Sequence, residues 1–160
     1  MIFERSKLTK NQILNNENRG SIYTYICENP GVYFYQIAKT LKLSNYILGW
    51  HIKMLIKFNF IRSKVIDKHE VFFDINLEDD YDELYYFISK EKSQIIINFL
   101  IKNPEGITKT RISRELKMHP KTTTKYIKSL EVVNILLKKK ETKKTLYFLN
   151  EPFYFRVFKN

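Results

Sequence analysis

Residues 118–130 place cationic and hydroxyl side chains at spacings that suit contact with a polyanion, and they read MHPKTTTKYIKSL. His119 can cap a helix in which Pro120 occupies the first position, where no amide donor is needed. A buried stripe with helical spacing is predicted at Thr123, Ile127 and Leu130. The opposite face carries Lys121, Thr122, Thr124, Lys125 and Lys128. Ammonium groups and small hydroxyls fit phosphates and base edges, although any solvated helix face can be rich in lysine.

A shorter helix is predicted just before this one, with Thr108 as its cap. Its inward face comprises Ile112, Ser113 and Leu116. Only residues 117–119 separate the two helices, and two helices joined by so short a turn form a helix-turn-helix, whose second member enters the major groove of DNA. Lys109 and Arg111 lie near the start of the first helix, where we expect them to approach phosphate.

A lysine-rich hairpin is predicted directly after the two helices, within residues 135–149. Its tip carries Lys138, Lys139, Lys140, Lys143 and Lys144. Such a hairpin forms a wing beside a helix-turn-helix, and its cationic tip can hold DNA backbone. The sequence therefore predicts double-stranded DNA as the partner of this part of the chain.

The charge distribution supports this assignment. The 160 residues have a net charge of +11. Residues 1–75 hold 11 basic and 6 acidic side chains, residues 76–90 hold 1 and 5, and residues 91–160 hold 16 and 6. The second half is therefore the stronger candidate for nucleic acid. A hydrophobic content of 44%, of which much is aromatic, predicts a folded chain.

The same order of elements is predicted twice, 75 residues apart. In the first copy, helices are expected at 19–28, at 34–41 and from Ser44 or Asn45 to about 58, and strands at 61–66 and 71–75. Ile37 then corresponds to Ile112, Leu55 to Leu130 and Asn59 to Asn134. A shared apolar skeleton of this length indicates a tandem duplication of one small domain.

The expected fold is mainly α with small β-hairpin wings, as two tandem winged helix-turn-helix domains joined by an acidic and aromatic helix. Residues 1–76 form the first domain with a short N-terminal helix, for which Thr9 begins a possible capping box. Residues 77–90 form the linking helix, and residues 91–160 form the second domain with an aromatic tail. The linking helix has apolar side chains at Leu77, Tyr81, Leu84, Tyr85 and Ile88 and carboxylates near its start at Asp79, Asp80, Asp82 and Glu83.

The C-terminal tail is strongly apolar and bears on whether the chain has a partner. Residues 153–158 hold five large apolar side chains in six positions, and either the domain itself or a partner must cover them. We expect a homodimer that forms through the linking helix, the N-terminal helix or this tail.

Several other kinds of chemistry are not expected. His51, His69 and His119 lack metal-ligand spacing, and four scattered glycines form no phosphate-binding loop, so we predict no metal, no cofactor and no enzyme. His51 is expected to be packed and hydrogen-bonded, and the single Cys27 to be a small buried hydrophobe. The absence of a membrane-length apolar run, of a signal-peptide pattern and of disulfides predicts a cytoplasmic, nucleoid-associated protein.

Over about residues 18–150, the chain resembles the archaeal tandem winged-helix regulators, in the neighbourhood of the ArsR and MarR families, and the first copy carries the resemblance best. The resemblance rests on NPGVYFYQIA at 29–38, GWHIKML at 49–55 and FIRSK at 60–64. It implies DNA binding in transcriptional control, usually by a dimer. On the third helix of this copy, the resemblance points Asn45, Tyr46, Trp50 and Lys53 toward DNA. The wing tip departs from the family pattern, because residues 67–70 contain no glycine and include two acidic residues.

Three functions remain open at this stage. A transcriptional regulator is favoured, with the second copy as the main DNA reader and the first as a weaker reader or a dimerisation unit. An architectural protein that coats DNA without reading its sequence is the second. The third is a protein-assembly subunit, which the aromatic tail and the apolar residues around Trp50 favour and the lysine-rich wing does not.

Overall fold

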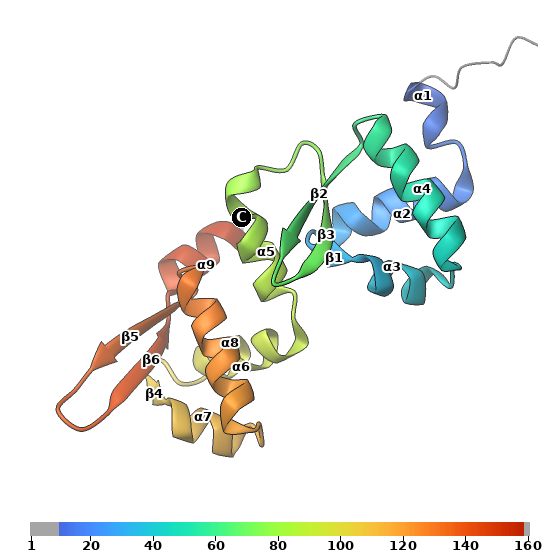
Figure 1. The fold of residues 1–160 in the computed structure, drawn as a ribbon. Helices are drawn as coiled ribbons and strands as arrows, with labels where there is room; N and C mark the ends of the chain where they lie inside the picture. The colour runs from blue at the N-terminus through green and yellow to red at the C-terminus, as the bar shows by residue number, and fades with distance from the viewer. Residues whose placement is uncertain (1–9, 159–160) are drawn as a thin grey trace, which may run out of the picture. The chain divides into compact units, whose positions relative to one another are not determined.

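The computed structural model describes residues 10–158, and the chain divides into unit 1 (Met1–Asp82) and unit 2 (Glu83–Asn160). The elements of unit 1 are α1 (Lys10–Ile13), α2 (Glu17–Glu28), β1 (Val32–Tyr33), α3 (Phe34–Leu41), α4 (Asn45–Lys57), β2 (Ile61–Ile66), β3 (His69–Asp74) and the 3-10 helix η1 (Asp79–Tyr81) (Figure 1). The helix α5 (Asp82–Ile88) follows, and unit 2 continues with α6 (Glu91–Ile101), β4 (Ile107–Thr108), α7 (Lys109–Glu115), α8 (Pro120–Val132), β5 (Leu136–Lys140), β6 (Thr145–Leu149) and α9 (Glu151–Phe158). Helices with two small antiparallel three-stranded sheets are consistent with a winged helix.

The helices of unit 1 begin where side-chain caps satisfy their first amides. Asn16 accepts a hydrogen bond from the amide of Arg19, and Ser44 accepts one from the amide of Ile47. The helices then bury one apolar stripe each against the sheet. The core of unit 1 includes Ile22, Ile26, Ile37, Leu48, Ile52, Leu55, Ile61 and Phe72. Each of these helices therefore contributes apolar side chains to a single core.

The two units share a backbone plan with an offset of 75 residues. Each sheet has its short first strand paired with the last strand, which pairs in turn with the middle one. Equivalent strand pairs are Val32 with Phe72 in unit 1 and Ile107 with Tyr147 in unit 2. Left-handed backbone occurs at Gly31, Lys42 and Asn59 in unit 1 and at Gly106, Lys117 and Asn134 in unit 2. The same turns therefore end the same helices in both units.

The hairpin of unit 1 and the linking segment differ from the sequence-based expectations. The hairpin of unit 1 turns at Asp67 and Lys68 alone, both with positive φ, so His69 and Glu70 belong to β3. The linking segment starts as the 3-10 helix, and its fully buried aromatic side chain is Tyr86 rather than Tyr85. The expected cap at Thr9 lies outside the described residues.

Cys27 was expected to be buried, and this is wrong, because the thiol is exposed at the surface of α2. It donates a hydrogen bond to Asp74 Oδ2 over 3.2 Å, and the Tyr23 hydroxyl donates to the same oxygen over 2.5 Å. Burial alone raises the pKa of Asp74, but hydrogen bonds from Tyr23, the Asn76 amide and Cys27 outweigh it and lower that pKa. Partial burial and the hydrogen bond to Asp74 raise the pKa of the Cys27 thiol to about 11.

We expect Cys27 to react with iodoacetamide about tenfold more slowly than a free cysteine near pH 8, because its thiolate is scarce and the higher nucleophilicity of a basic thiolate offsets only part of that. Asp74→Asn removes a group that raises the pKa and accelerates the reaction. Tyr23→Phe removes a hydrogen bond that lowers the pKa and slows it. Mass spectrometry gives the rates directly, since the chain has a single cysteine. Wild-type labelling at the rate of free cysteine contradicts the prediction.

Candidate nucleic-acid interface

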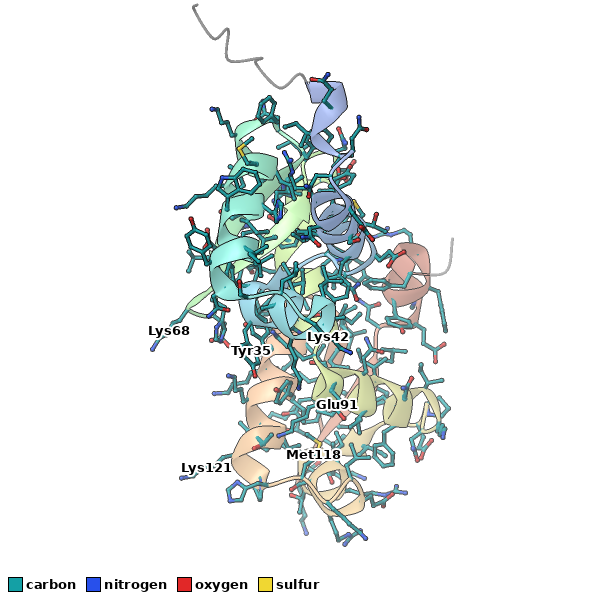
Figure 2. The ribbon with its side chains drawn as sticks, turned by 90° about the vertical axis from the view of Figure 1, so that its right-hand side faces the viewer. Tyr35, Lys42, Lys68, Glu91, Met118 and Lys121 are labelled. Atoms are coloured by element: carbon teal, nitrogen blue, oxygen red, sulfur yellow. The ribbon has the colours of Figure 1, made fainter. Side chains whose placement is uncertain are left out.

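The helix α8 has the predicted cap and the predicted two faces. The Nδ1 atom of His119 accepts a hydrogen bond from the amide of Lys121, and Pro120 is the first helical residue. Thr123, Ile127 and Leu130 are at most 1% exposed, which confirms the buried stripe. Of the predicted DNA-contacting residues, Lys121, Lys125 and Lys128 are exposed, whereas Thr122 and Thr124 are half-buried. Figure 2 shows Lys121 extending away from the helix.

The hydroxyl of Thr124 is already engaged, because it donates to the Pro120 carbonyl over 2.9 Å. It can still accept a hydrogen bond, as from a cytosine or adenine amino group, but it cannot donate a second one. The lysines of α8 therefore provide most of the groups on this face that can bind a phosphate.

The two cations predicted on α7, Lys109 and Arg111, differ in whether they form an ion pair. Thr108 caps the helix by accepting a hydrogen bond from the amide of Arg111. Lys109 is exposed. The side chain of Arg111 instead forms an ion pair with Glu115, with Nε 2.6 Å from Oε1. The hydrogen bond to Glu115 raises the pKa of Arg111. Arg111 must exchange this carboxylate for any phosphate it binds, so its contribution is smaller than that of Lys109.

The wing of unit 2 is the hairpin of β5 and β6, and its five lysines are all exposed. Lys138 forms an ion pair with Glu131 on α8 over 3.0 Å, and Lys144 forms one with Glu141 over 3.5 Å. The hydrogen bond to Glu131 raises the pKa of Lys138. Within residues 10–158, no ion pair is found for Lys139, Lys140 or Lys143. These three lysines are therefore the cations of the wing that a polyanion meets without competition.

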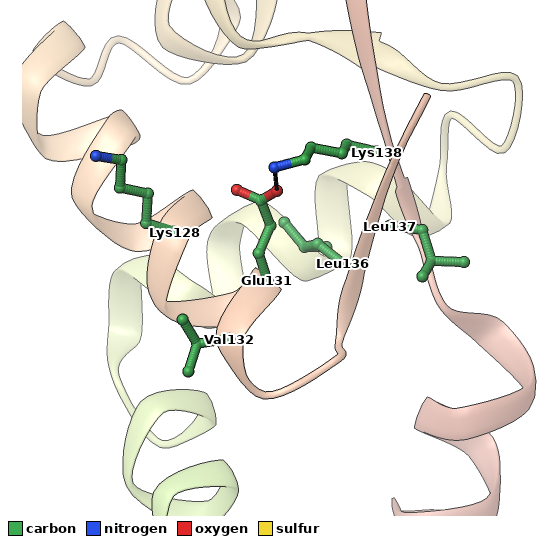
Figure 3. Close-up of a pocket in the computed structure, with 6 residues that line it drawn as sticks. All are labelled: Lys128, Glu131, Val132, Leu136, Leu137 and Lys138. Carbon is green, nitrogen blue, oxygen red and sulfur yellow. Dashed lines mark ion pairs between the residues drawn. The ribbon is translucent and has the colours of Figure 1, made fainter. Parts of the chain in front are cut away.

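An apolar pocket of about 510 Å³ lies where α8 ends beside β5 (Figure 3). Its lining consists of Lys128, Glu131, Val132, Leu136, Leu137 and Lys138. The ammonium group of Lys138 points to Glu131, whereas Lys128 points away from that carboxylate. Lys138 therefore closes the base of the wing against α8, a structural role that the run of lysines in the sequence did not reveal.

A second pocket of about 320 Å³ joins the start of α7 to the tip of the wing. This Lys109 pocket is lined by Thr108, Lys109, Thr110, Lys143, Lys144, Thr145 and Tyr147. Burial and the nearby carboxylate of Glu131 raise the pKa of Tyr147, so its hydroxyl stays protonated and can donate. Three ammonium groups and several hydroxyls in one concavity match the hydrogen-bonding needs of a phosphate.

Sequence reasoning missed Thr110, Thr145 and Tyr147 as residues of this pocket. Thr145 and Tyr147 are two residues apart on β6, so their side chains lie on the same face of the strand. The pairing of Tyr147 with Ile107 brings β6 beside the start of α7. This pairing joins segments that lie far apart in the sequence, so local residue patterns did not reveal it.

The four residues predicted in unit 1 are all exposed on α4, namely Asn45, Tyr46, Trp50 and Lys53. Tyr46 is 87% exposed and Trp50 49% exposed. His51, expected to be packed and hydrogen-bonded, is indeed buried, but its Nδ1 has no hydrogen-bond partner within residues 10–158. Burial and the charge of Arg19 lower the pKa of His51.

The described part of the chain shows neither a metal site nor a membrane-spanning helix. Among residues 10–158, no group of three or more His, Cys, Asp and Glu side chains is arranged to hold a metal ion. No helix in that range has the length and apolar character needed to span a membrane.

No protein-family model matches the chain. An uncharacterized HTH-type transcriptional regulator of Methanocaldococcus jannaschii is 29% identical over 144 residues, which cover 90% of this chain and 36% of that protein. Among solved structures, the transcriptional regulator SlyA aligns with 74% of this chain and 82% of its own at 19% identity and a TM-score of 0.37. ScpB from Mycobacterium tuberculosis aligns with 95% of this chain and 98% of its own at 8% identity and a TM-score of 0.35. The chain is thus similar in sequence to an archaeal HTH-type regulator and spans little more than a third of its length.

Proposed function

We propose that the protein is a transcriptional regulator that binds double-stranded DNA, with the two units acting as tandem winged helix-turn-helix domains. In unit 2, α8 enters the major groove and the wing lies along the flanking backbone. Such a role places the protein on the nucleoid in the cytoplasm. The similarity to an HTH-type regulator supports the general role, and the assignment to unit 2 rests on its own side chains.

The observation that carries the proposal is the Lys109 pocket. Lys109 comes from the first helix of the helix-turn-helix, whereas Lys143 and Lys144 come from the wing tip, so one concavity unites both elements. A phosphate seated there would fix the orientation of unit 2 on the duplex, because backbone contacts set register and base contacts set sequence. The exposed lysines of α8 then supply the adjoining cationic surface.

A titration of duplex DNA at several salt concentrations tests the proposal. If about six phosphates are neutralised, the logarithm of the association constant falls with the logarithm of salt concentration at a slope near −5. Fluorescence anisotropy of a labelled duplex measures this slope. A slope near zero removes DNA as the partner.

Selection of bound fragments from random DNA separates a regulator from an architectural protein. A regulator prefers its selected site over random duplex by about 10³-fold or more, whereas a protein that coats DNA shows no such preference. A palindromic selected site supports a two-fold symmetric dimer.

A further inference from the structure

The helix α4 of unit 1 exposes rings where the equivalent helix of unit 2 exposes cations. With the 75-residue offset, Tyr46, Ile47 and Trp50 occupy the positions of Lys121, Thr122 and Lys125. We call these three residues of α4 the Trp50 face. Tyr46 is 87%, Ile47 41% and Trp50 49% exposed. The two units therefore share one backbone arrangement but expose different kinds of side chain on this helix.

The same replacement occurs at the position of the Lys109 pocket. Its residues Thr108, Thr110 and Lys144 correspond to Tyr33, Tyr35 and His69 in unit 1. The rings of Tyr33 and His69 pack at 5.5 Å with an interplanar angle of 30°, and Tyr35 is exposed. Unit 1 therefore offers aromatic rings at positions where unit 2 offers small hydroxyl and ammonium side chains.

The indole of Trp50 is held in place from within the protein. The Arg19 guanidinium carbon lies 5.3 Å from the centre of the ring, and the His51 ring meets it nearly edge-on at 4.9 Å. Arg19 is only 5% exposed, so the ring surface that it covers is the inner one. A fixed ring with an open outer surface loses little conformational entropy when a second ring stacks on it.

The surroundings of the Trp50 face are cationic. Residues 29–66 contain Lys39, Lys42, Lys53, Lys57, Arg62 and Lys64 and no acidic residue. Nε and Nη1 of the buried Arg19 have no hydrogen-bond partner within residues 10–158, so its charge is not neutralised there by a bonded carboxylate. Of the cations in residues 29–66, Arg62 and Lys64 pair with Asp82, whereas no ion pair is found within residues 10–158 for Lys39, Lys42, Lys53 or Lys57. The potential around the Trp50 face therefore attracts a polyanion.

The exposed rings distinguish between two forms of nucleic acid. A duplex hides the flat surfaces of its bases within the stack and offers edges that call for hydrogen-bonding side chains. Unpaired bases expose those surfaces, and aromatic side chains stack on them. We propose that the Trp50 face binds single-stranded nucleic acid, with Tyr46 and Trp50 stacking on unpaired bases and nearby lysines holding the backbone. This activity is separate from duplex binding by unit 2.

Trp50 itself provides the assay, because it is the single tryptophan of the chain. The full-length protein is titrated with single-stranded oligomers of deoxythymidine and of uridine, each roughly ten nucleotides long. Stacking on the indole is expected to quench Trp50 fluorescence in a saturable manner. The two oligomers show whether DNA or RNA is preferred, and absence of saturable quenching by both overturns the proposal.

Tyr46→Ala tests the mechanism while leaving the reporter in place. The loss of one stacked base lowers affinity for the oligomer by roughly 5- to 150-fold. The control Ile101→Ala removes an exposed apolar side chain from α6 of unit 2 and leaves that affinity unchanged. Circular dichroism confirms that both variants fold.

Two comparisons separate this proposal from other roles. Lys139→Glu with Lys143→Glu, which targets duplex binding by unit 2, is expected to keep single-strand affinity within about twofold of wild type. If Tyr46→Ala leaves oligomer affinity unchanged but weakens self-association in analytical ultracentrifugation, the Trp50 face is an interface between copies of the chain, and the proposal is wrong.

Discussion

Replacing Lys139 and Lys143 by glutamate is expected to lower affinity for duplex DNA by about 60-fold near 0.1 M salt. Each lost phosphate contact removes about 0.9 from the salt slope, so two contacts remove about 1.8. The pair is chosen because neither lysine forms an ion pair within the described chain, whereas Lys138 and Lys144 do. Reversal of charge adds repulsion, so the estimate is a lower bound.

The matched control is Lys92→Glu with Lys102→Glu, which changes net charge by the same amount. Both lysines are exposed at the two ends of α6, away from the helix-turn-helix and the wing in the chain. This variant should retain most of the affinity and nearly the full salt slope. Equal losses in the two variants mean that only total charge matters, and the wing then has no specific role.

The local features of the interface were predictable because they depend on neighbours in sequence. The cap at His119 and the stripe of Thr123, Ile127 and Leu130 follow from helical spacing alone. The ion pair of Arg111 with Glu115 was equally readable, since residues four apart on a helix are neighbours. The expectation that Arg111 approaches phosphate leaves this ion pair out.

Contacts between distant segments could not be predicted in this way. Nothing in a run of lysines distinguishes Lys138, which is paired with Glu131 on α8, from Lys139, whose side chain lies on the other side of the strand. Cys27 occupies an apolar helical run, yet the position of β3 brings Asp74 to it and leaves the thiol at the surface. Both cases require the register of a hairpin with the helices around it.

The two copies of the 75-residue repeat share their backbone geometry, but equivalent positions carry different functional side chains. Gly106 illustrates the conserved geometry, because it has a φ of +85° and any added Cβ would collide with the ring of Phe148. Trp50 and Lys125 illustrate the divergence, since equivalent positions carry a ring in one unit and a cation in the other. Assigning one function to both units from the shared backbone alone would therefore be unsound.

Asp82→Asn is expected to destabilise unit 1 by about 3–5 kcal/mol, the cost of breaking a buried ion pair by removing one partner. The Asp82 side chain is fully buried, and its two oxygens accept hydrogen bonds from the Arg62 guanidinium at 2.7 and 2.8 Å. Arg62 also donates to the Leu77 carbonyl over 3.0 Å, so the pair fixes the segment that follows β3. An asparagine accepts only one of these bonds and leaves the guanidinium charge uncompensated.

Urea unfolding followed by Trp50 fluorescence measures the effect, because that tryptophan lies in unit 1. Asp80→Asn is the control. It makes the same chemical change two residues away at an exposed carboxylate, and its effect should stay within about 0.5 kcal/mol. If both variants unfold at the wild-type urea concentration, the Arg62–Asp82 pair contributes nothing to stability.

Replacing both partners distinguishes the cost of an orphaned charge from the worth of the pair itself. Arg62→Met with Asp82→Leu leaves no buried charge, and such replacements are often neutral or stabilising. The double variant should therefore recover most of the stability lost in Asp82→Asn, aided by contact of the methionine with Phe73, over whose ring Arg62 now lies at 4.9 Å. If the double variant remains as unstable as Asp82→Asn, the directional bonds to Asp82 and Leu77 hold the segment, and apolar packing cannot replace them.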